Sequence, residues 1–303
     1  WCKEEKIKFL CPAPGYDRHF AICESLGIEM ITLDMKKDGP DMDALEEWVA
    51  KDPAVKGIWC VPKYSNPTGI TYSDEVVRRL VTMKTAAQDF RIYWDNAYMI
   101  HDLYDEGDRL LNIFDEAKKA GTEDRVMFFT SSSKITFPGA GVSMMAMSLN
   151  NLSQVEPIWN VQTIGHDKLN QLRHLEFLTD KGAVLTVMKK HAAILRERFD
   201  IVLSALHKDL DGTGIAEWTE PKGGYFISLN TLPGCAARVY ELCSKAGVKL
   251  TKAGATFPYG KDPLDRNLRL APSYPSAEDL RKAVDVLTVA VRMASLEKLM
   301  KNA

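Results

Sequence analysis

The sequence predicts an α/β fold with two domains: a large domain built on a mostly parallel sheet, and a smaller α+β domain at the C-terminal end. In the first half of the chain, short apolar runs alternate with segments of helical periodicity, as in parallel strands joined by crossover helices. Residues 179–210 then carry one long helical pattern, which we expect to link the two domains. We assign residues 1–180 to the large domain and residues 181–303 to the linking helix and the small domain.

The expected elements follow one another at short intervals. In the large domain, apolar runs predict strands over residues 7–11, 29–34, 55–61, 91–95, 126–130 and 143–148. Helical spacing predicts helices over residues 17–26, 42–51 and 73–89, with Gly27 ending the first and Asp41 capping the second. In the small domain we expect strands over residues 225–229 and 267–271, and helices over residues 236–246 and 277–299.

The bulk composition is that of an ordinary globular protein and argues against several functional classes. Of the 303 residues, 46% are hydrophobic and 26% are charged, and the net charge is −2 with both signs interspersed. This balance does not suggest a nucleic-acid-binding or membrane-surface protein, and no apolar run approaches the length of a membrane span. The six cysteines lack C-x-x-C spacing, so we expect reduced, buried thiols in a cytoplasmic protein rather than disulfides or a metal site.

The beginning of the chain is unusual. It starts Trp1-Cys2-Lys3, without a methionine, and it enters a predicted strand almost at once. We therefore expect that a further N-terminal segment precedes Trp1.

An acidic side chain ends one of the predicted buried strands. Asp95 lies in the segment Trp94-Asp95-Asn96-Ala97-Tyr98, where a carboxylate is costly unless a cation pairs with it. A protonated pyridine nitrogen is such a cation, and the hydroxyl of Tyr98 could lie near an oxygen of the same ring. The competing interpretation is that Asp95 caps the turn that follows the strand.

A lysine follows another predicted strand. Lys134 comes after the hydroxyls of Ser131, Ser132 and Ser133 and before a Pro-Gly loop. An amine that is desolvated in such a pocket has a lowered pKa and can form a Schiff base; once released, it can also move a proton. Ser131 and Ser133 could bind phosphate oxygens. Taken alone, a lysine in this context is more often a surface or interface residue.

Two further polar residues fit a site for a small anionic ligand. Asn66, in the turn Ser65-Asn66-Pro67-Thr68-Gly69, can donate its amide hydrogen to an oxyanion, although this turn is uninformative by itself. Arg269 interrupts the predicted strand 267–271, and its guanidinium matches the α-carboxylate of an amino acid in a bidentate pair. The alternative for Arg269 is a structural salt bridge to Asp265 or Glu278.

Together these segments resemble the fold-type I pyridoxal-phosphate aminotransferases. The resemblance covers nearly the whole chain and is closest to the bacterial aspartate aminotransferases sometimes called class Ic. It is carried by the strings CPAPGYDRHF, YSNPTG, WDNAY, SSSKITFPGAGVS, QTIGHDKLNQLRH, PKGGYFISL and NLRLAPSYP. It implies pyridoxal 5'-phosphate as cofactor and the transfer of an amino group between an amino acid, aspartate or glutamate, and a 2-oxo acid.

The resemblance also implies a role for each matching residue. Lys134 would hold the cofactor as a Schiff base and act as the catalytic residue, and Asp95 would pair with the pyridine nitrogen. Asn66 and Tyr98 would contact the phenolic oxygen of the cofactor. Arg269, with Asn66 beside it, would bind the substrate α-carboxylate.

Phosphate binding departs from the pattern of the family. Ser131 matches the serine that commonly binds the cofactor phosphate, and Ser133 is a second candidate. Many aminotransferases place an arginine seven or eight residues after the lysine, whereas Gly141 and Val142 stand there in this chain. Further phosphate contacts are expected from a helix N-terminus in the segment that precedes Trp1. Tyr16 is our candidate for the aromatic residue that stacks on the cofactor ring.

A dicarboxylic substrate needs a second cation, which in related enzymes comes from a partner subunit. His166, Lys168 and Arg173 are candidates, and a solvated helix face explains them equally well. We therefore expect a homodimer with shared active sites.

Two other functions are compatible with the same residues. A transcriptional regulator of the MocR type carries DNA-binding helices upstream of an aminotransferase-like sensor domain. Another reaction on the same cofactor, such as β-decarboxylation or β-elimination, would use the same lysine and aspartate. What precedes Trp1 would identify a regulator, and analysis of the products would identify a different reaction.

Overall fold

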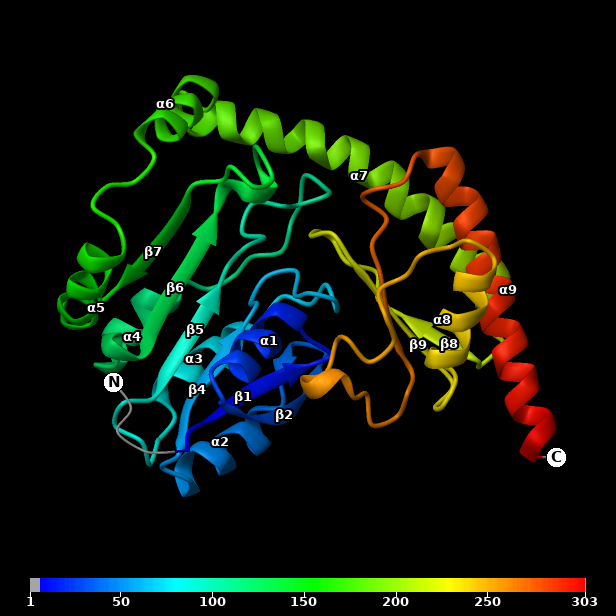
Figure 1. Ribbon diagram of the computed structural model, residues 1–303, viewed down its shortest axis with the longest axis horizontal. Coiled ribbons are helices and arrows are strands. Elements are labelled where there is room, and N and C mark those ends of the chain that lie inside the picture. Colours follow the sequence, from blue (N-terminus) through cyan, green and yellow to red (C-terminus); the bar gives the residue numbers. More distant parts are fainter. Residues whose placement is uncertain (1–5, 303) are drawn as a thin grey trace.

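The computed structural model describes residues 6–302 of the chain. Residues 1–5 and 303, which include Trp1 and the predicted buried thiol of Cys2, lie outside the described residues. Two sheets organise the molecule, one of seven strands and one of three (Figure 1). In the sequence, the strands of the first sheet precede residue 180 and those of the second follow it. A domain boundary at that residue stays a prediction.

The seven-stranded sheet is mostly parallel, as predicted. Its strand order is β3-β2-β1-β4-β5-β6-β7, and the two edge strands β3 and β7 pair antiparallel to their neighbours. The other pairs are parallel. The strands span β1 Lys8–Ala13, β2 Glu29–Lys36, β3 Gly39–Pro40, β4 Val55–Cys60, β5 Arg91–Asp95, β6 Val126–Ser131 and β7 Ser143–Met147.

The order in which the chain adds strands to this sheet reverses at β1. From β1 it continues to β2 on one side, and it later returns to β4 on the other side of β1. Beyond the carboxyl ends of two such strands the connections diverge and leave a crevice, where open α/β sheets bind ligands. The sheet therefore places its candidate ligand site beyond β1, β4, β5 and β6.

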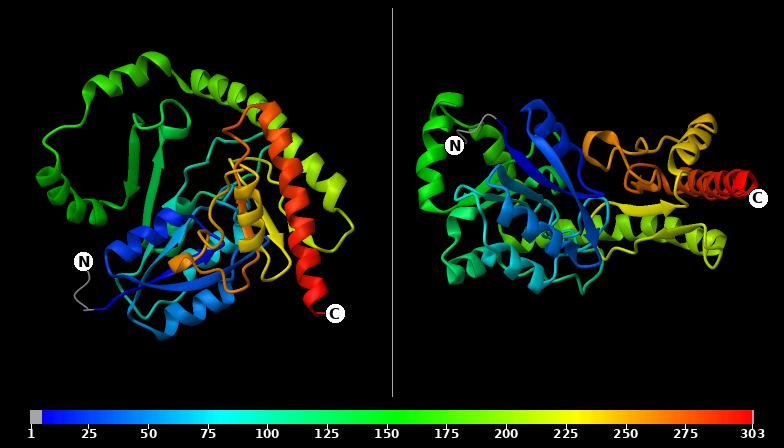
Figure 2. Two further views of the ribbon diagram at one scale, coloured as in Figure 1. Left: turned by 45° about the vertical axis from the view of Figure 1, so that its right-hand side comes forward. Right: turned by 90° about the horizontal axis from the view of Figure 1, so that it is seen from below.

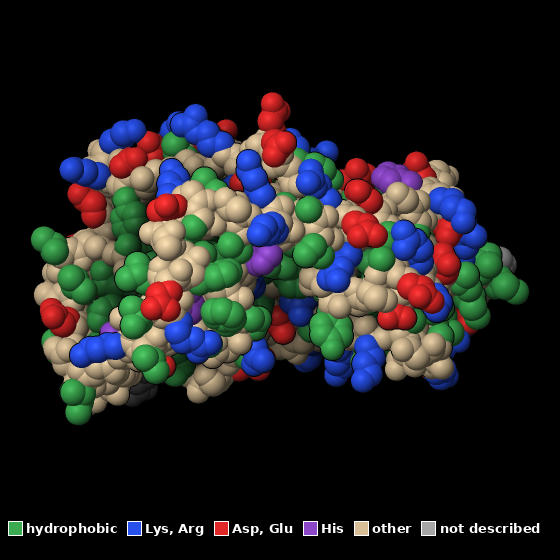
Figure 3. Space-filling model, turned by 90° about the horizontal axis from the view of Figure 1, so that it is seen from above, with side chains coloured by type: hydrophobic (Ala, Val, Ile, Leu, Met, Phe, Trp, Pro, Cys, Tyr) green, Lys and Arg blue, Asp and Glu red, His purple; other side chains and the backbone are tan. Residues whose placement is uncertain are grey.

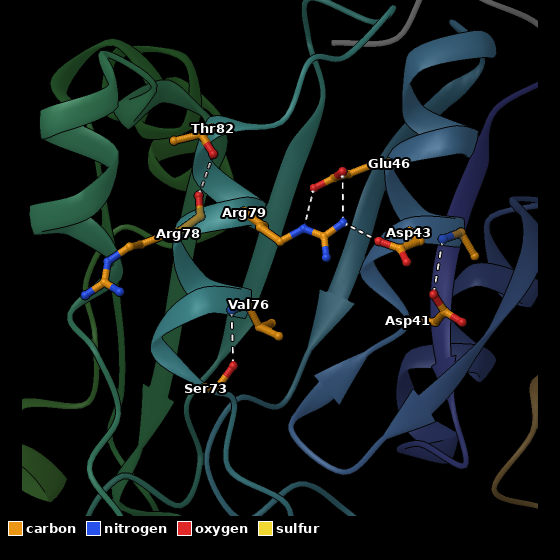
Figure 4. A network of polar contacts seen from close by, with 9 residues as sticks. Asp41, Asp43, Glu46, Ser73, Val76, Arg78, Arg79 and Thr82 are labelled. Carbon is orange, nitrogen blue, oxygen red and sulfur yellow. Dashed lines mark hydrogen bonds and ion pairs between the residues drawn. The ribbon is translucent and has the colours of Figure 1, made fainter.

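Helices cover the seven-stranded sheet, and two of them are joined by ion pairs. The Asp41 side chain caps α2 as predicted by accepting from the amide of Ala44. Arg79 on α3 reaches Glu46 on α2, with Nε 2.8 Å from Oε1, and also Asp43 (Figure 4). The helices span α1 Asp17–Ser25, α2 Met42–Lys51, α3 Asp74–Thr82 and α4 Ile113–Ala120.

The predicted helix over residues 73–89 is too long, because α3 ends at Thr82. Backbone groups beyond that point bond to other elements instead of continuing the helix. The Met83 carbonyl accepts from the Arg125 guanidinium at 2.7 Å, and the Ala86 amide donates to the Val49 carbonyl at 2.7 Å. At Met83 and Ala86 these tertiary contacts take the place of hydrogen bonds within a helix.

Three helices were not predicted individually: α4, α5 (Leu149–Gln162) and α6 (Lys168–Phe177). Helices α5 and α6 expose many large apolar side chains, and Figure 3 shows hydrophobic groups at the end of the molecule that carries these helices. The exposed residues are Leu149, Ile158, Val161, Ile164, Leu169, Leu172, Leu175 and Phe177. Surfaces of this kind usually face another chain or another segment.

The long helix follows the prediction closely, whereas the second sheet contains β8, a strand that the sequence did not predict, and β9 begins at Ile227 instead of Tyr225. Helix α7 (Lys181–Leu210) runs from α6 to the three-stranded sheet, where α9 (Ala277–Asn302) packs against it (Figure 1). The antiparallel sheet has the order β10-β9-β8, and α8 completes this part. The remaining bounds are β8 Ala216–Trp218, β9 Ile227–Thr231, β10 Asn267–Leu270 and α8 Ala236–Lys245.

A loop of the small-sheet part reaches across to the large sheet. It contains the short 3-10 helix η3 (Pro258–Gly260), which lies beside α1 and β2 (Figure 2). The Thr256 carbonyl accepts from the Gly15 amide at 2.7 Å, and the Tyr259 hydroxyl accepts from the Met30 amide at 2.9 Å. The segment that follows β1 is therefore bonded to both parts of the molecule.

Each sheet has its own apolar core. The cysteines in the described residues are buried, as predicted, and their thiols are free. They are Cys11, Cys23, Cys60, Cys235 and Cys243. None of the helices within residues 6–302 is long and apolar enough to cross a membrane.

Candidate active site

Lys134 lies at the end of η2 (Ser132–Lys134), directly after β6. Its backbone carbonyl accepts hydrogen bonds from the Tyr225 hydroxyl at 3.1 Å and from His101 Nε2 at 3.3 Å. Its Nζ lies 5.1 Å from the centre of the Tyr98 ring. Burial lowers the pKa of the amine, and the charge of Asp95 offsets part of that effect. Asp95 ends β5, the strand that pairs with β6 ahead of Lys134.

Asp95 is the last residue of β5, where the sequence placed it. Its Oδ2 lies 3.0 Å from Nε2 of His19, a buried residue of α1. The imidazole of His19 stacks on Trp59, with ring centres 4.3 Å apart and planes inclined by 12°. An ionised carboxylate can only accept, so His19 donates this bond and fixes the direction of the Asp95 side chain.

Tyr98 and Tyr16 bring aromatic rings to the same region. Tyr98 is buried, and burial raises the pKa of its hydroxyl well above the usual range, so the group stays protonated. Tyr16 immediately precedes α1 and lies in the cluster around Val61, Tyr64 and Tyr98. Its ring meets that of His19 edge-on, with centres 5.1 Å apart. A small cavity beyond β1 and β4 is lined by Tyr16, His19, Ser65 and Asn66, among others.

Arg269 extends from β10 toward the large sheet. Its Nη1 lies 3.2 Å from Oδ1 of Asn66 and 2.9 Å from Oδ1 of Asp17, the first residue of α1. The salt bridge that the sequence offered as an alternative, to Asp265 or Glu278, is wrong in its partner. Arg269 instead pairs with an acid that is 252 positions away in the chain, and it thereby joins the two sheets at the site.

The serines ahead of Lys134 are held in a compact turn. Ser131 and Ser133 share a hydrogen bond of 2.8 Å between their hydroxyls, and the Ser131 hydroxyl also accepts from the Ser133 amide. Gly141 lies directly against Ser133, and a Cβ on Gly141 would overlap the Ser133 hydroxyl. An arginine in place of Gly141 would therefore not fit this turn.

The three residues proposed as a second cation do not belong to the cluster around Lys134 and Asp95. His166, Lys168 and Arg173 are exposed, on α6 or just before it. Arg173 lies over the ring of Phe137, at 5.4 Å from its centre. Among the contacts of the described residues, none links them to Asp95 or Lys134.

Sequence reasoning missed four residues of the site: Asp17, His19, His101 and Tyr225. His101 is buried, and burial lowers its pKa to about 4; its Nδ1 has no hydrogen-bond partner among the described residues. The signal for His19 was present, because it stands three positions after Tyr16 and so on the same face of a helix. Nothing local marked the other three.

A model of the family described as aspartate amino-transferase matches residues 1–303. This chain belongs to the aspartate aminotransferase family. A putative aminotransferase from Mycolicibacterium smegmatis is 50% identical to this family member over 99% of the chain and 70% of its own length. An aspartate aminotransferase from Corynebacterium glutamicum is 49% identical over 98% of the chain and 68% of its own length.

A solved structure supports the same assignment. The crystal structure of an aspartate transaminase from Corynebacterium glutamicum superposes on this aspartate aminotransferase family member with a TM-score of 0.95 and 49% identity. The match covers 98% of this chain and 70% of that one. The predicted fold type and the predicted activity, amino-group transfer, are confirmed by these findings. They do not support a regulator or a decarboxylase.

Proposed function

We propose that this family member uses pyridoxal 5'-phosphate to move an amino group between aspartate or glutamate and a 2-oxo acid. One observation carries the proposal: Lys134 and Asp95 lie at the carboxyl ends of the neighbouring parallel strands β6 and β5, and the Lys134 amine is 5.1 Å from the centre of the buried Tyr98 ring. The dicarboxylic substrate follows the printed name of the Corynebacterium glutamicum relatives.

The residues fit the cofactor on grounds of their own chemistry. A lysine with a lowered pKa holds more of its amine in the nucleophilic form, which is what attachment to an aldehyde needs. A carboxylate fixed by His19 suits a protonated ring nitrogen, and the paired hydroxyls of Ser131 and Ser133 suit phosphate oxygens. When bound, pyridoxal phosphate supplies an electron sink for the electrons released at the substrate α-carbon.

Each residue then has a defined task in the proposal. Lys134 Nζ holds the cofactor and, once the substrate has displaced it, moves the proton at the substrate α-carbon. Asp95 keeps the proton on the ring nitrogen, and His19 keeps Asp95 in place. Tyr98 contacts the phenolic oxygen, and Tyr16 stacks on the ring.

Arg269 and Asn66 bind the substrate in this proposal. The guanidinium of Arg269 binds the α-carboxylate. Asn66 lies beside the guanidinium, with its Oδ1 3.2 Å from Nη1 of Arg269. Because Arg269 lies on β10 of the small sheet and Asn66 in the turn that follows β4 of the large sheet, substrate binding depends on how these parts lie against each other.

We also propose a cytoplasmic homodimer. The apolar residues that α5 and α6 expose support a protein partner for this face, and the unpaired cysteines support a reducing compartment. The second cation for a dicarboxylic substrate would then come from the partner subunit or from His166, Lys168 or Arg173. Light scattering on the purified protein tests the dimer, and a monomer would contradict it.

The function is tested by incubating the cofactor-loaded protein with aspartate and 2-oxoglutarate. We expect glutamate and oxaloacetate in equal amounts, and no glutamate from the Lys134→Ala variant. Production of alanine from aspartate, without glutamate, would instead indicate β-decarboxylation and overturn the proposal. A panel of other amino acids as donors then defines the substrate range.

A further inference from the structure

We propose that Asp17 is a specificity-determining residue: its carboxylate occupies Arg269 in the substrate-free enzyme and leaves when the substrate α-carboxylate binds. This inference rests on the proposed function, because it takes Arg269 as the carboxylate-binding residue. In addition, the Asp17 carboxylate competes with the substrate for Arg269.

The contacts of Arg269 define what a substrate meets. Nη1 faces both Asp17, at 2.9 Å, and Asn66, at 3.2 Å, while Nε lies 3.4 Å from the Thr251 hydroxyl. The guanidinium also lies over the Phe226 ring, at 5.1 Å from its centre. A bidentate carboxylate needs two parallel N–H groups, and the hydrogens of Nη1 already point at protein oxygens.

Charge makes simultaneous binding unfavourable. A substrate carboxylate on Arg269 would lie within a few ångströms of the Asp17 carboxylate, and like charges that share one cation repel. One of the two carboxylates has to leave. The exchange also explains how a largely buried arginine, with its side chain 13% exposed, is neutralised when no substrate is present.

Asp17 is the partner that can move. Its side chain is 37% exposed, against 13% for Arg269, and it stands at the first position of α1. Within the described residues, no side chain caps this helix at Tyr16. The unbonded amides and the dipole of the helix N-terminus therefore favour a carboxylate that turns away from Arg269.

The competition favours ligands that are held at more than one point. Asp17 is part of the chain, so its carboxylate is present at Arg269 at a high effective concentration. A simple monocarboxylate binds only through its one carboxylate and has to displace Asp17 with that group alone. An amino acid that is also held at its amino group has its α-carboxylate fixed near Arg269, and this carboxylate then competes with Asp17 at a similarly high effective concentration. Asp17 thus discriminates against small carboxylates that would otherwise occupy Arg269.

The test uses the cofactor-loaded full chain and propionate, a monocarboxylate without an amino group, with its Kd measured by isothermal titration calorimetry. Asp17→Asn removes the charge at constant shape, and we expect it to tighten propionate binding about fivefold, the effect of losing a half-exposed ion pair. Asp17→Glu retains the carboxylate and should stay within about twofold of the original Kd, by the same reasoning. The KM for aspartate should fall in Asp17→Asn and not in Asp17→Glu.

Arg269→Gln separates failure of this inference from failure of the proposed function. If Arg269→Gln weakens propionate binding but Asp17→Asn binds it no more tightly than the original protein, the competition is refuted and the role of Arg269 stands. If Arg269→Gln binds propionate unchanged, the carboxylate site is elsewhere and both proposals fall. Thermal unfolding of each variant verifies that the protein compared is folded.

Discussion

His19 Nε2 donates a hydrogen bond of 3.0 Å to Asp95 Oδ2, and the same imidazole lies flat against Trp59. Asp95, at the end of β5, is therefore held by a residue of α1 that packs against Trp59 of the neighbouring strand β4. This arrangement holds the Asp95 carboxylate in one orientation at the end of its strand.

Replacement of His19 by Phe tests this anchoring. Phenylalanine keeps a flat ring against Trp59 but cannot donate to Asp95, so only the hydrogen bond is lost. A hydrogen bond to a charged group is worth about 1.5–3 kcal/mol, so we expect kcat for aspartate to fall about ten- to a hundredfold.

His19→Gln is the matched control for that experiment, because its amide can still donate and should recover part of the activity. Equal activity of His19→Phe and the original protein would show that Asp95 needs no anchor. Steady-state kinetics at saturating aspartate and 2-oxoglutarate provide the comparison.

His101 should make the protein sensitive to acid. Its pKa is lowered to about 4 in the folded protein, chiefly by burial, while a histidine in the unfolded chain has its ordinary pKa of 6.5. Between these values the unfolded chain binds the extra proton, so stability is complete above about pH 6.5 and declines as the pH falls toward 4. The loss amounts to about 3 kcal/mol.

Urea unfolding at a series of pH values measures this effect. In His101→Gln, which keeps a donor for the Lys134 carbonyl, the decline between pH 6.5 and pH 4 should be shallower by roughly the contribution of one histidine. Parallel pH profiles for the two proteins would contradict a neutral, buried His101.

Gly223 should be intolerant of a side chain. A Cβ at this position would overlap the ring of Tyr64, a fully buried residue, which itself bonds Asp102 at 2.6 Å. Gly223→Ala should destabilise the protein by about 1–3 kcal/mol, as other overpacked sites do.

Gly165→Ala is the control for that substitution, because a Cβ there meets nothing within 4 Å. The free energies of unfolding of the two variants, compared with the original protein, provide the test. If Gly223→Ala is no less stable than Gly165→Ala, the loop of residues 221–226 is not packed tightly against Tyr64.

Local sequence signals predicted most of the strands, but not β3 or β8, and they marked Asp95 and Lys134 as candidate site residues. Asp95 and Lys134 each follow a short apolar run, and the polar residue at the end of such a run is visible without any knowledge of the fold. The long helix α7 was predicted for the same reason, because its apolar residues repeat over eight turns.

The unpredicted features depend on contacts between distant parts of the chain. Asp17 meets Arg269 across 252 positions, and His19 meets Asp95 across 76. Likewise, α3 stops at Thr82 because Arg125 takes the carbonyl of Met83. Residue types and periodicity carry no information on such partners, so the pairings emerge only with the fold.

In the proposed function, the Lys134 amine holds pyridoxal phosphate. Borohydride reduction of the cofactor-loaded protein fixes the cofactor to the amine that holds it, and peptide mass spectrometry after proteolysis then locates the modified lysine. We predict a single phosphopyridoxyl group on Lys134, and none on the exposed Lys190 of α7. A modification on another lysine, or none on Lys134, would contradict the account.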